Sequence, residues 1–417
     1  MLNGPVRWQR FLPLILLVFG VAAHQSSLES GVFLFDDHKV ILGDPHIGTL
    51  LPLPQATRLL SYLSFRLNYR LAGGFVEADY HLTNLGIHLA AGLLLYGLMR
   101  RTLQFWPQRP VWMHPEGFAW LVATAWTVHP LQTECVAYVC QRAEAMAGLF
   151  LMAMLYAFSR RLTAGGAARG WFYAALACGL LGLLSKEVMV VAPAVLLAYD
   201  GAFGARLAGG LRARWKEHVA FGLLIPAFLV LWLANMVQWF ERGLGEGGGG
   251  AMGAGAFLLN QGPVILHYMR LAAFPVNLCL DYGWTPVATV WHALPAVAVL
   301  GVLFGASLVG QFRGAAWGFL GLAFFILLSP SSSVIPRPDL AFEHRMYAAL
   351  APLLTAAAAG AGWVLYRVGK ARAVRWGWCA GWGWVIVLTA LTFIRGLDYA
   401  SASGMWGKVA AQRPRNL

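Results

Sequence analysis

The chain has 417 residues, of which 59% are hydrophobic and only 12% are charged. A water-soluble domain carries roughly 25% charged residues because its surface must be solvated, so this composition excludes an ordinary soluble protein. The net charge of +13 does not indicate nucleic-acid binding, because the basic residues are scattered in small groups at the ends of apolar runs. We therefore expect an all-α polytopic membrane protein.

Apolar runs recur from one end of the chain to the other and predict about eleven transmembrane helices. Several runs are shorter than the roughly 20 residues that a helix needs to cross a bilayer, so we expect these spans to rest on neighbouring helices. The expected spans lie near residues 11–25, 81–99, 118–130, 144–159, 171–186, 188–200, 219–237, 290–311, 315–331, 346–366 and 377–395. The first run has no convincing cleavage site after it, so we interpret it as an uncleaved span.

The charged residues of the loops predict the orientation. With the N-terminus in the cytoplasm, the basic residues of the short connections gather on the cytoplasmic face, as the positive-inside rule requires. The same face holds only Glu116, Asp200 and Glu217 among the 18 acidic residues. The C-terminus and any chemistry are therefore expected on the outer face.

Three outer segments are long, at about residues 24–80, 238–290 and 331–345. In the second, residues 257–280 are apolar but carry polar interruptions. We expect this stretch to lie in the interface or to re-enter, because a full crossing would reverse the orientation of everything after it. The glycine-rich residues 243–255 have little capacity to pack and predict a mobile loop.

Two adjacent carboxylates, Asp36 and Asp37, follow an apolar stretch in the first outer segment. A carboxylate at this position can act as a general base that takes a proton from an acceptor hydroxyl. The alternative is a solvated turn, in which such dipeptides are common.

A second polar cluster contains His129, Glu134 and Arg142. If the segment is helical, Glu134 and Arg142 lie eight residues apart on roughly one face. Arg142 could then bind an anion such as a phosphate, or form a structural ion pair with Glu134. A metal site at His129 and Glu134 is disfavoured, because a five-residue gap across Pro130 fits no common ligand motif.

Further charged residues mark the outer ends of other spans. Lys186 either pairs with Glu187 or another acid, or binds an anionic ligand. Asp281 follows the interfacial stretch. Asp339 and Glu343 could cap a helix N-terminus, where the dipole favours acids.

Capping does not explain the two residues that follow Glu343, which are His344 and Arg345. Taken together, acids suited to base chemistry and cations suited to a departing phosphate are expected on one membrane face. This combination is typical of a group transfer with a phosphate leaving group.

With these motifs in hand, the chain resembles the transmembrane and tetratricopeptide-repeat O-mannosyltransferases and their bacterial relatives, within the C-type glycosyltransferase superfamily. The matching stretches keep the family order over roughly residues 33–350. They are FDDHKVILGDPHI, LSFRLNYRLAGG, YHLTNLGIHLAAGLLLYGLMRR, HPLQTECVAYVCQRAEAMAGLF, LLSKEVMVVAPAVLLAYD, MRLAAFPVNLCLDY and SSSVIPRPDLAFEHRMY.

The resemblance implies a C-type glycosyltransferase fold over residues 1–395, with amphipathic helices in the long first outer loop at about 24–80. Residues 396–417 are similar to the start of a first tetratricopeptide repeat, and the repeats themselves are not in the chain. Whether they are naturally absent or truncated is left open. The implied location is a bacterial inner membrane, with the N-terminus cytoplasmic and both the active site and the C-terminus periplasmic.

The implied reaction is an inverting transfer of a sugar from a polyprenyl phosphate to a hydroxyl of an exported protein. Asp36 or Asp37, with Asp36 preferred, is the expected general base. The expected ligands of the donor phosphate are Arg142, Lys186 and Arg345. The expected substrate-orienting residues are His129, Glu134, Asp281, Glu343 and His344. No cofactor or metal is predicted, although metal use varies across the superfamily.

Two other functions stay open at this point. The first is transfer of a whole lipid-linked oligosaccharide to an exported protein. The second is a lipid or solute transporter, which we disfavour because transporters place ionisable groups near the bilayer midplane and often have repeated halves. Here the charges collect at one rim, and no halves repeat in the sequence.

Overall fold

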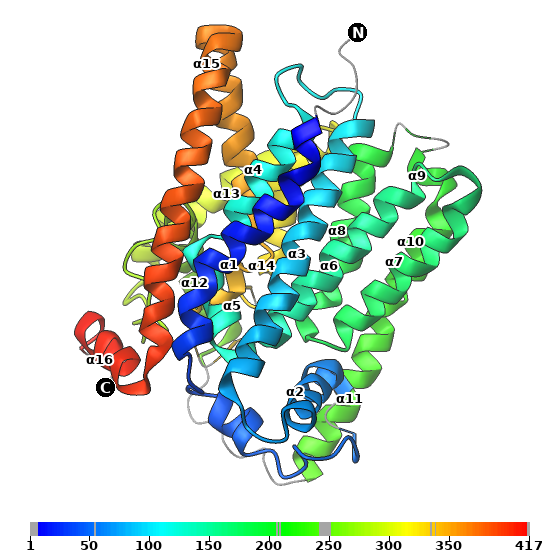
Figure 1. The fold of residues 1–417 in the computed structure, drawn as a ribbon. Coiled ribbons are helices and arrows are strands. Elements are labelled where there is room, and N and C mark those ends of the chain that lie inside the picture. Colours follow the sequence, from blue (N-terminus) through cyan, green and yellow to red (C-terminus); the bar gives the residue numbers. More distant parts are fainter. Residues whose placement is uncertain are drawn as a thin grey trace.

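The computed structural model describes residues 7–53, 56–205, 207, 210–241, 252–333, 336–337 and 339–414. Within these residues every regular element is helical, and there is no strand. The larger helices are α1 (Leu12–Ser30), α2 (Leu59–Ala72), α3 (Glu77–Phe105), α4 (Pro115–Thr127), α5 (Thr133–Ala137), α6 (Arg142–Arg161), α7 (Ala168–Leu183), α8 (Ala192–Tyr199), α10 (Trp215–Gly222), α11 (Leu224–Glu241), α12 (Ala254–Ala273), α13 (Val290–Phe312), α14 (Ala316–Leu328), α15 (Leu350–Leu397) and α16 (Ala402–Gln412). Figure 1 shows them as one bundle.

Local sequence accounts for several helix ends. Helix α3 carries Glu77 and Asp79 in its first turn, where acids are stabilised by the helix dipole. It ends at Phe105. The next residue, Trp106, precedes Pro107, and a residue before a proline disfavours helical backbone. Helix α4 starts with Pro115, which suits a first helical position because no N–H is needed there.

Five helical segments of the described chain are long and apolar enough to cross a membrane, which makes the chain a multi-pass membrane protein. They are Gln9–Glu29, Glu77–Phe105, Glu187–Gly204, Val290–Phe312 and Arg372–Ala400. A sixth arises if Pro130–Ala137 and Val139–Arg161 are counted as one broken span. The other expected spans correspond to shorter or less apolar helices such as α7 and α14, so the total of about eleven stays a prediction.

Helix α15 is two helices joined by a sharp reversal. Lys370 lies at the join with φ 49° and ψ −140°, outside helical geometry. Figure 1 shows the two segments running side by side in opposite directions (orange to red) and meeting at the end of the bundle that carries the N-terminus. The reversal agrees with the two separate spans expected at 346–366 and 377–395.

The long helices pack against one another as a series of neighbouring pairs. Helix α1 packs against α3, α4 and α15. Helix α6 packs against α3 and α7, and α14 packs against α8, α13 and α15. The two ends of the described chain lie at opposite ends of this bundle (Figure 1).

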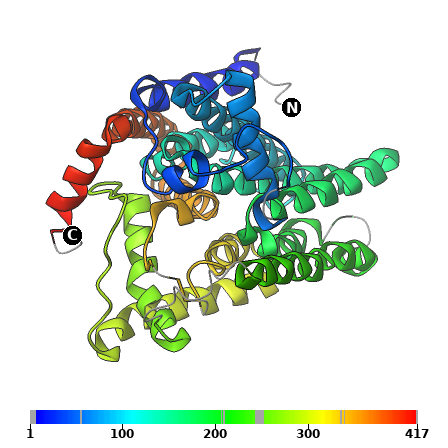
Figure 2. The ribbon, with the colours of Figure 1, turned by 90° about the horizontal axis from the view of Figure 1, so that it is seen from below.

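The first outer segment closes one end of the bundle. Figure 2, seen from that end, shows the blue segment between α1 and α3 lying across the ends of other helices. Within it, α2 packs against α3 and α6. Its Ser61 hydroxyl donates a hydrogen bond to the carbonyl of Ser185 at 2.8 Å, which ties the segment to the end of α7.

One local prediction from the sequence is wrong. Glu134 and Arg142 do not share a helical face, because α5 ends at Ala137 and the chain bends by 102° before it continues into α6.

Helix α12, in the stretch expected to lie in the interface, is a continuous helix that packs against α13 and is not among the candidate spans. Most of the expected glycine-rich mobile loop, residues 243–255, falls outside the described residues.

Candidate active site

A polar cavity of about 260 Å³ opens where the first outer segment, the α5–α6 break, the end of α7 and the stretch before α15 come together. Four cationic side chains line it together with two acids of the outer segments, one acid of α6 and one histidine. These residues are Arg58, Lys186, Arg337, Arg345, Asp36, Asp339, Glu144 and His344. Four of the ten residues expected from the sequence therefore lie on one cavity: Asp36, Lys186, His344 and Arg345.

The two adjacent aspartates have opposite environments. Asp36 is exposed and lines the cavity, whereas the side chain of Asp37 has no exposed surface. The Asp37 carboxylate accepts hydrogen bonds from the backbone N–H groups of Cys140 at 2.6 Å, Leu34 at 3.0 Å and Val139 at 3.3 Å. Asp37 thus fastens the outer segment to the α5–α6 break, and only Asp36 is free to meet a substrate.

Backbone strain sits next to Asp36. Phe35 has φ 48°, a left-handed conformation that costs a bulky residue free energy and is often found at functional sites. Its ring lies 5.6 Å from the ring of Trp406 in α16 and 6.3 Å from that of Tyr138. The Tyr138 hydroxyl accepts the backbone N–H of Asp36 at 3.0 Å. These contacts hold the turn that presents the Asp36 carboxylate.

Burial changes the protonation of Asp37. Desolvation raises the pKa of Asp37 to about 7, although the three N–H donors oppose this rise because they favour the ionised form. The same effect, together with the nearby carboxylates Asp281 and Asp36, raises the pKa of Asp339 above its usual value.

Lys186 pairs with an acid other than its neighbour in sequence. Its Nζ lies 2.6 Å from Oε2 of Glu144 in α6 and also donates to Oε1 of Gln141 at 3.4 Å. Glu187 is bound instead by Arg58, whose guanidinium donates at 2.7 and 3.0 Å. Sequence separation hides this exchange of partners, because each pair joins residues more than 40 positions apart.

Arg58 and Arg337 are cavity residues that the sequence did not single out. The Arg337 guanidinium lies 3.9 Å from the Glu187 carboxylate. Arg337 falls within the SSSVIPRPDLAFEHRMY stretch, so its proximity to Arg345 was a usable signal. Arg58 lies in a short 3-10 turn before α2, and no local pattern marked it.

Arg345 is held by neutral groups. Its guanidinium donates to the carbonyls of Asp339 at 2.7 Å, Leu340 at 2.8 Å and Ser331 at 3.4 Å. Carbonyl partners fix the side chain but leave its positive charge uncompensated by a bonded carboxylate. The positive charge therefore remains available to an anion in the cavity.

Arg142, which was expected to bind the donor phosphate, is not among the residues that line the cavity. Its side chain is completely buried. The guanidinium donates to Asn84 and Asn68 at 2.6 Å each and to the Tyr80 carbonyl at 3.0 Å, and it lies 4.7 Å over the ring of Phe65. Arg142 therefore links α2, α3 and α6 as a structural residue.

Four of the five expected orienting residues do not line the cavity: His129, Asp281, Glu343 and Glu134, whose carboxylate binds His344. His129 is buried, bonds the Ala272 carbonyl at 3.1 Å and accepts the N–H of Leu131 at 3.2 Å. Asp281 accepts the N–H of Gly283 at 3.0 Å and so closes a turn. The structure gives each of them a local framework contact.

Glu343 is the third of these residues. Its Oε1 accepts the N–H of Cys279 at 2.6 Å and the hydroxyl of Tyr282 at 2.7 Å, and its carboxylate lies 3.6 Å from Arg395. Burial raises the pKa of Glu343 to about 7, and the charge of Arg395 opposes that rise. Glu343 thus ties the stretch before α15 to the segment after α12, which differs from the helix cap that the sequence allowed.

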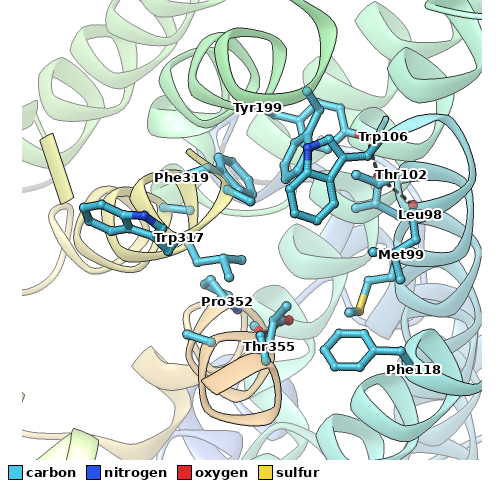
Figure 3. A pocket seen from close by; sticks show the side chains of 18 of the residues that line it. Leu98, Met99, Thr102, Trp106, Phe118, Tyr199, Trp317, Phe319, Pro352 and Thr355 are labelled. Carbon is cyan, nitrogen blue, oxygen red and sulfur yellow. Dashed lines mark hydrogen bonds between the residues drawn. The ribbon is translucent and has the colours of Figure 1, made fainter. Parts of the chain in front are cut away.

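A second, apolar cavity of about 640 Å³ adjoins the polar one. It lies between α3, α6, α8, α14 and α15, and Figure 3 shows side chains of these helices pointing into it, among them Met99, Tyr199 and Phe319. Its lining includes Trp106, which directly follows the C-terminal end of α3, and Leu327, which lies near the C-terminal end of α14. Leu327 lines both cavities, so the two are neighbours across one side chain.

Within the described residues, no group of three or more histidine, cysteine, aspartate or glutamate side chains is placed to hold a metal ion. The side chains of this arrangement offer one exposed carboxylate, several fixed cations and one imidazole around a cavity that borders an apolar one.

Comparison with known proteins supports the resemblance that the motifs indicate. No family model matches the chain. The mouse protein O-mannosyl-transferase TMTC4 is 27% identical over 185 residues, which are 38% of this chain and 25% of that protein. The fruit fly (Drosophila melanogaster) protein O-mannosyl-transferase Tmtc2 is 30% identical over 191 residues, 40% of this chain and 19% of that protein.

A longer match is the Caenorhabditis elegans protein O-mannosyl-transferase F38B6.6, at 24% identity over 351 residues, which are 77% of this chain and 47% of that protein. The matched region thus spans less than half the length of each of these relatives. Among solved structures, an Archaeoglobus fulgidus oligosaccharyltransferase tethered with an acceptor peptide has a TM-score of 0.47 and 13% identity. That comparison covers 94% of this chain and 55% of the other.

Proposed function

We propose that this chain is a membrane glycosyltransferase of the C-type superfamily. In this proposal it moves a sugar from a polyprenyl phosphate to a hydroxyl group of a protein acceptor. The observation that carries the proposal is a single polar cavity that holds an exposed carboxylate, Asp36, together with four cations, and that borders an apolar cavity at Leu327. Relatives that are named protein O-mannosyl-transferases support the protein acceptor.

The two cavities match the two halves of such a donor. An isoprenoid chain is apolar and suits a cavity walled by α3, α6, α8, α14 and α15. The phosphate is anionic and suits the cations Lys186, Arg345, Arg58 and Arg337. Lys186 and Arg58 each already have a carboxylate partner, so Arg345, bound only by carbonyls, is the cation best placed to meet the phosphate charge.

Asp36 is the proposed general base. Its carboxylate takes the proton of the acceptor hydroxyl while the hydroxyl oxygen attacks the anomeric carbon. The bond from that carbon to the phosphate oxygen breaks, and the cations stabilise the charge that develops on the departing phosphate. Attack from the face opposite the phosphate inverts the anomeric carbon. No step of this proposal needs Asp37, whose carboxylate is already occupied by the backbone.

The proposed orientation follows the basic loops, with the N-terminal end of the bundle in the cytoplasm and the polar cavity on the outer face. For a bacterial protein this means the inner membrane, with the site in the periplasm. The segment between α1 and α3, which supplies Asp36 and Arg58 to the cavity, lies at the end of the bundle opposite the start of α1 (Figure 1), which is consistent with this placement.

The test is a transfer assay on the full chain in lipid nanodiscs, with polyprenyl-phosphate mannose as donor probe and a serine- and threonine-containing peptide as acceptor. We expect a peptide that is heavier by one hexose, and Asp36→Asn should lower kcat by about 100-fold or more, as expected for loss of a general base.

The matched control is Glu29→Gln, which removes an exposed carboxylate from the same end of the bundle but outside the cavity. Full activity of Asp36→Asn would contradict the role of this residue. A peptide that gains a whole oligosaccharide when a lipid-linked oligosaccharide is supplied, and none from the mannose donor, would instead show an oligosaccharide transferase.

A further inference from the structure

His344 is clamped in one orientation by a single buried carboxylate. Oε1 of Glu134 lies 2.6 Å from Nδ1 of the imidazole, and Oε2 accepts the backbone N–H of the same histidine at 2.9 Å. The Glu134 side chain has no exposed surface. One face of the imidazole ring stacks on the ring of Phe342, with ring centres 5.0 Å apart. The ring can therefore neither rotate nor exchange its two nitrogens.

The remaining nitrogen, Nε2, is directed at the polar cavity. His344 lines that cavity, and within the described residues Nε2 has no hydrogen-bond partner and is not among the buried atoms that lack one. An imidazole fixed through Nδ1 by a carboxylate, with Nε2 facing a ligand, is a recurrent arrangement for holding or moving a proton.

The pair most readily holds one shared proton between Oε1 and Nδ1. A lone carboxylate without exposed surface is costly to bury, whereas a pair with a shared proton is neutral overall. Whether the shared proton lies nearer Glu134 or nearer His344, Nε2 then carries its own hydrogen and can donate it to an oxygen in the cavity.

We propose that Glu134 and His344 form a proton-delivering pair, in which Nε2 of His344 protonates the departing phosphate and Glu134 is the positioning residue behind it. This inference rests on the proposed function. As the bond between the anomeric carbon and the phosphate oxygen breaks, a phosphate oxygen takes the Nε2 proton and Nδ1 takes the shared proton from Glu134. The proton of the acceptor hydroxyl goes to Asp36, so each proton has a named origin and destination.

The charges that face His344 favour this direction of transfer. Lys186, Arg345 and Arg337 act on the ring through their positive charges, and the acids that act on it are Glu144 and the directly bonded Glu134. Burial and the three cations lower the pKa of His344 well below its usual range, although Glu144 opposes that effect. When the shared proton lies on Nδ1, a ring that holds it weakly releases the Nε2 proton readily to a phosphate whose negative charge is growing. The dianion of a phosphate monoester takes up a proton with a pKa near 6.

Three substitutions separate proton delivery from structure. Glu134→Gln keeps a donor for Nδ1 and an acceptor for the backbone N–H, but it has no proton to pass on. His344→Gln places an amide N–H near the position of Nε2, whereas His344→Asn replaces only the Nδ1 side. Each variant is assayed in nanodiscs with polyprenyl-phosphate mannose, and Tm is measured to confirm that it folds.

We expect Glu134→Gln and His344→Gln to lower kcat by about 100-fold, the usual contribution of a general acid, while the donor KM changes by less than about threefold. His344→Asn should also raise the donor KM, because the phosphate loses its hydrogen-bond donor. In the wild-type protein, kcat should fall as pH rises and the pair loses its proton, and this alkaline limb should be absent in Glu134→Gln. A solvent isotope effect gives a second readout that does not depend on stability. Transfer by the wild-type protein should be slower in D2O than in H2O, and this difference should be absent in Glu134→Gln.

The outcomes distinguish the pair from the function on which it depends. Folded variants that keep wild-type kcat and the wild-type pH profile would overturn the proton-delivering pair while leaving the glycosyltransferase proposal standing. A wild-type protein that binds the donor but transfers no sugar to any acceptor would overturn the proposed function itself. A fall in kcat that follows Tm in all three variants, with the alkaline limb unchanged, would show that the pair is only structural.

Discussion

At the residue scale, the structure separates two aspartates that are indistinguishable in sequence. Asp36 and Asp37 differ by one position, and the turn at Phe35 places one carboxylate in the cavity and the other among backbone N–H groups. A backbone conformation with positive φ is therefore the feature that assigns them different tasks. Arg142 has a structural role and does not bind an anion, because its guanidinium already donates to Asn84, Asn68 and the Tyr80 carbonyl.

The buried Asp37 should control stability and its pH dependence. We expect Asp37→Asn to destabilise the fold by about 1–3 kcal/mol, the usual cost of leaving a buried hydrogen-bonding group unsatisfied. The pKa of Asp37 is about 7 in the folded protein against an ordinary 3.8, so between these values the folded state binds the extra proton. Stability should therefore fall as pH rises from about 4 to about 7 and then level off.

Thermal unfolding in nanodiscs at several pH values checks this expectation. Asp37→Asn should show a shallower decline in Tm over that range than the wild-type protein. Asp36→Asn provides the control, because it removes the neighbouring carboxylate, which is exposed, and its Tm profile should follow that of the wild type. A stability that instead rises with pH over the same interval would mean that the three N–H donors outweigh burial.

At the element scale, α16 reaches back to the turn that presents Asp36. The helix is fastened near its start by Asp398, which binds both Arg395 and Lys408 at 2.7 to 2.8 Å. The Ser401 hydroxyl caps it by accepting the N–H of Gly404 at 3.1 Å. Trp406 then meets Phe35. A helix that follows the last span thus supports the loop between the first two large helices.

We expect Trp406→Ala to lower kcat by up to about tenfold, with little change in the donor KM. An edge-to-face aromatic pair contributes about 0.5–1.5 kcal/mol, and about 1.4 kcal/mol corresponds to a factor of ten in rate. Trp406→Phe should recover most of the activity. Trp291→Ala removes an exposed tryptophan elsewhere and serves as the control. An unchanged kcat in Trp406→Ala would show that Phe35 is held by Tyr138 alone.

At the scale of the whole molecule, the packing of the helices leaves an apolar cavity between α3, α6, α8, α14 and α15 and a polar cavity beside it. The two meet at Leu327 of α14, which lines both cavities, and Lys186 and Arg345 line the polar one. An amphiphilic donor would have its phosphate among the cations and its chain along α14 and α15. This division also gives the four cations of the polar cavity a role in a largely apolar chain.

We expect Leu327→Trp to raise the KM for a long-chain polyprenyl-phosphate mannose by about tenfold or more, because a larger ring at the junction would obstruct the chain. A donor with a short chain that does not pass the junction should be affected much less. Val302→Trp, which places the same ring on the exposed surface of α13, is the control. Measuring Tm guards against overpacking of the core, which typically costs about 1–3 kcal/mol. Equal effects on short and long donors would place the chain elsewhere.

Much of the molecule was predictable because the signals are local. The low charge content and the apolar runs predicted an all-helical, multi-pass membrane protein, and the comparisons support the family resemblance carried by the ordered motifs. The membrane excludes unsatisfied backbone groups, so a long apolar run has few alternatives to a helix. Asp36, Lys186, His344 and Arg345 were identifiable for a similar reason, since a charge at the edge of an apolar span needs a partner or a ligand.

Only the tertiary structure decided which side chains meet. The 102° bend between α5 and α6 separated Glu134 from Arg142 and brought Glu134 to His344, 210 positions later. Lys186 forms its ion pair with Glu144 and not with its neighbour Glu187, which binds Arg58. Arg58 lines the cavity although it lies in a turn that no sequence motif marks. Composition and periodicity act over a few turns of helix, whereas the partner of a buried charge is set by how distant helices pack. The sequence alone determined the class of the protein and its charged rim, and the packing of the helices determined which carboxylate faces the cavity.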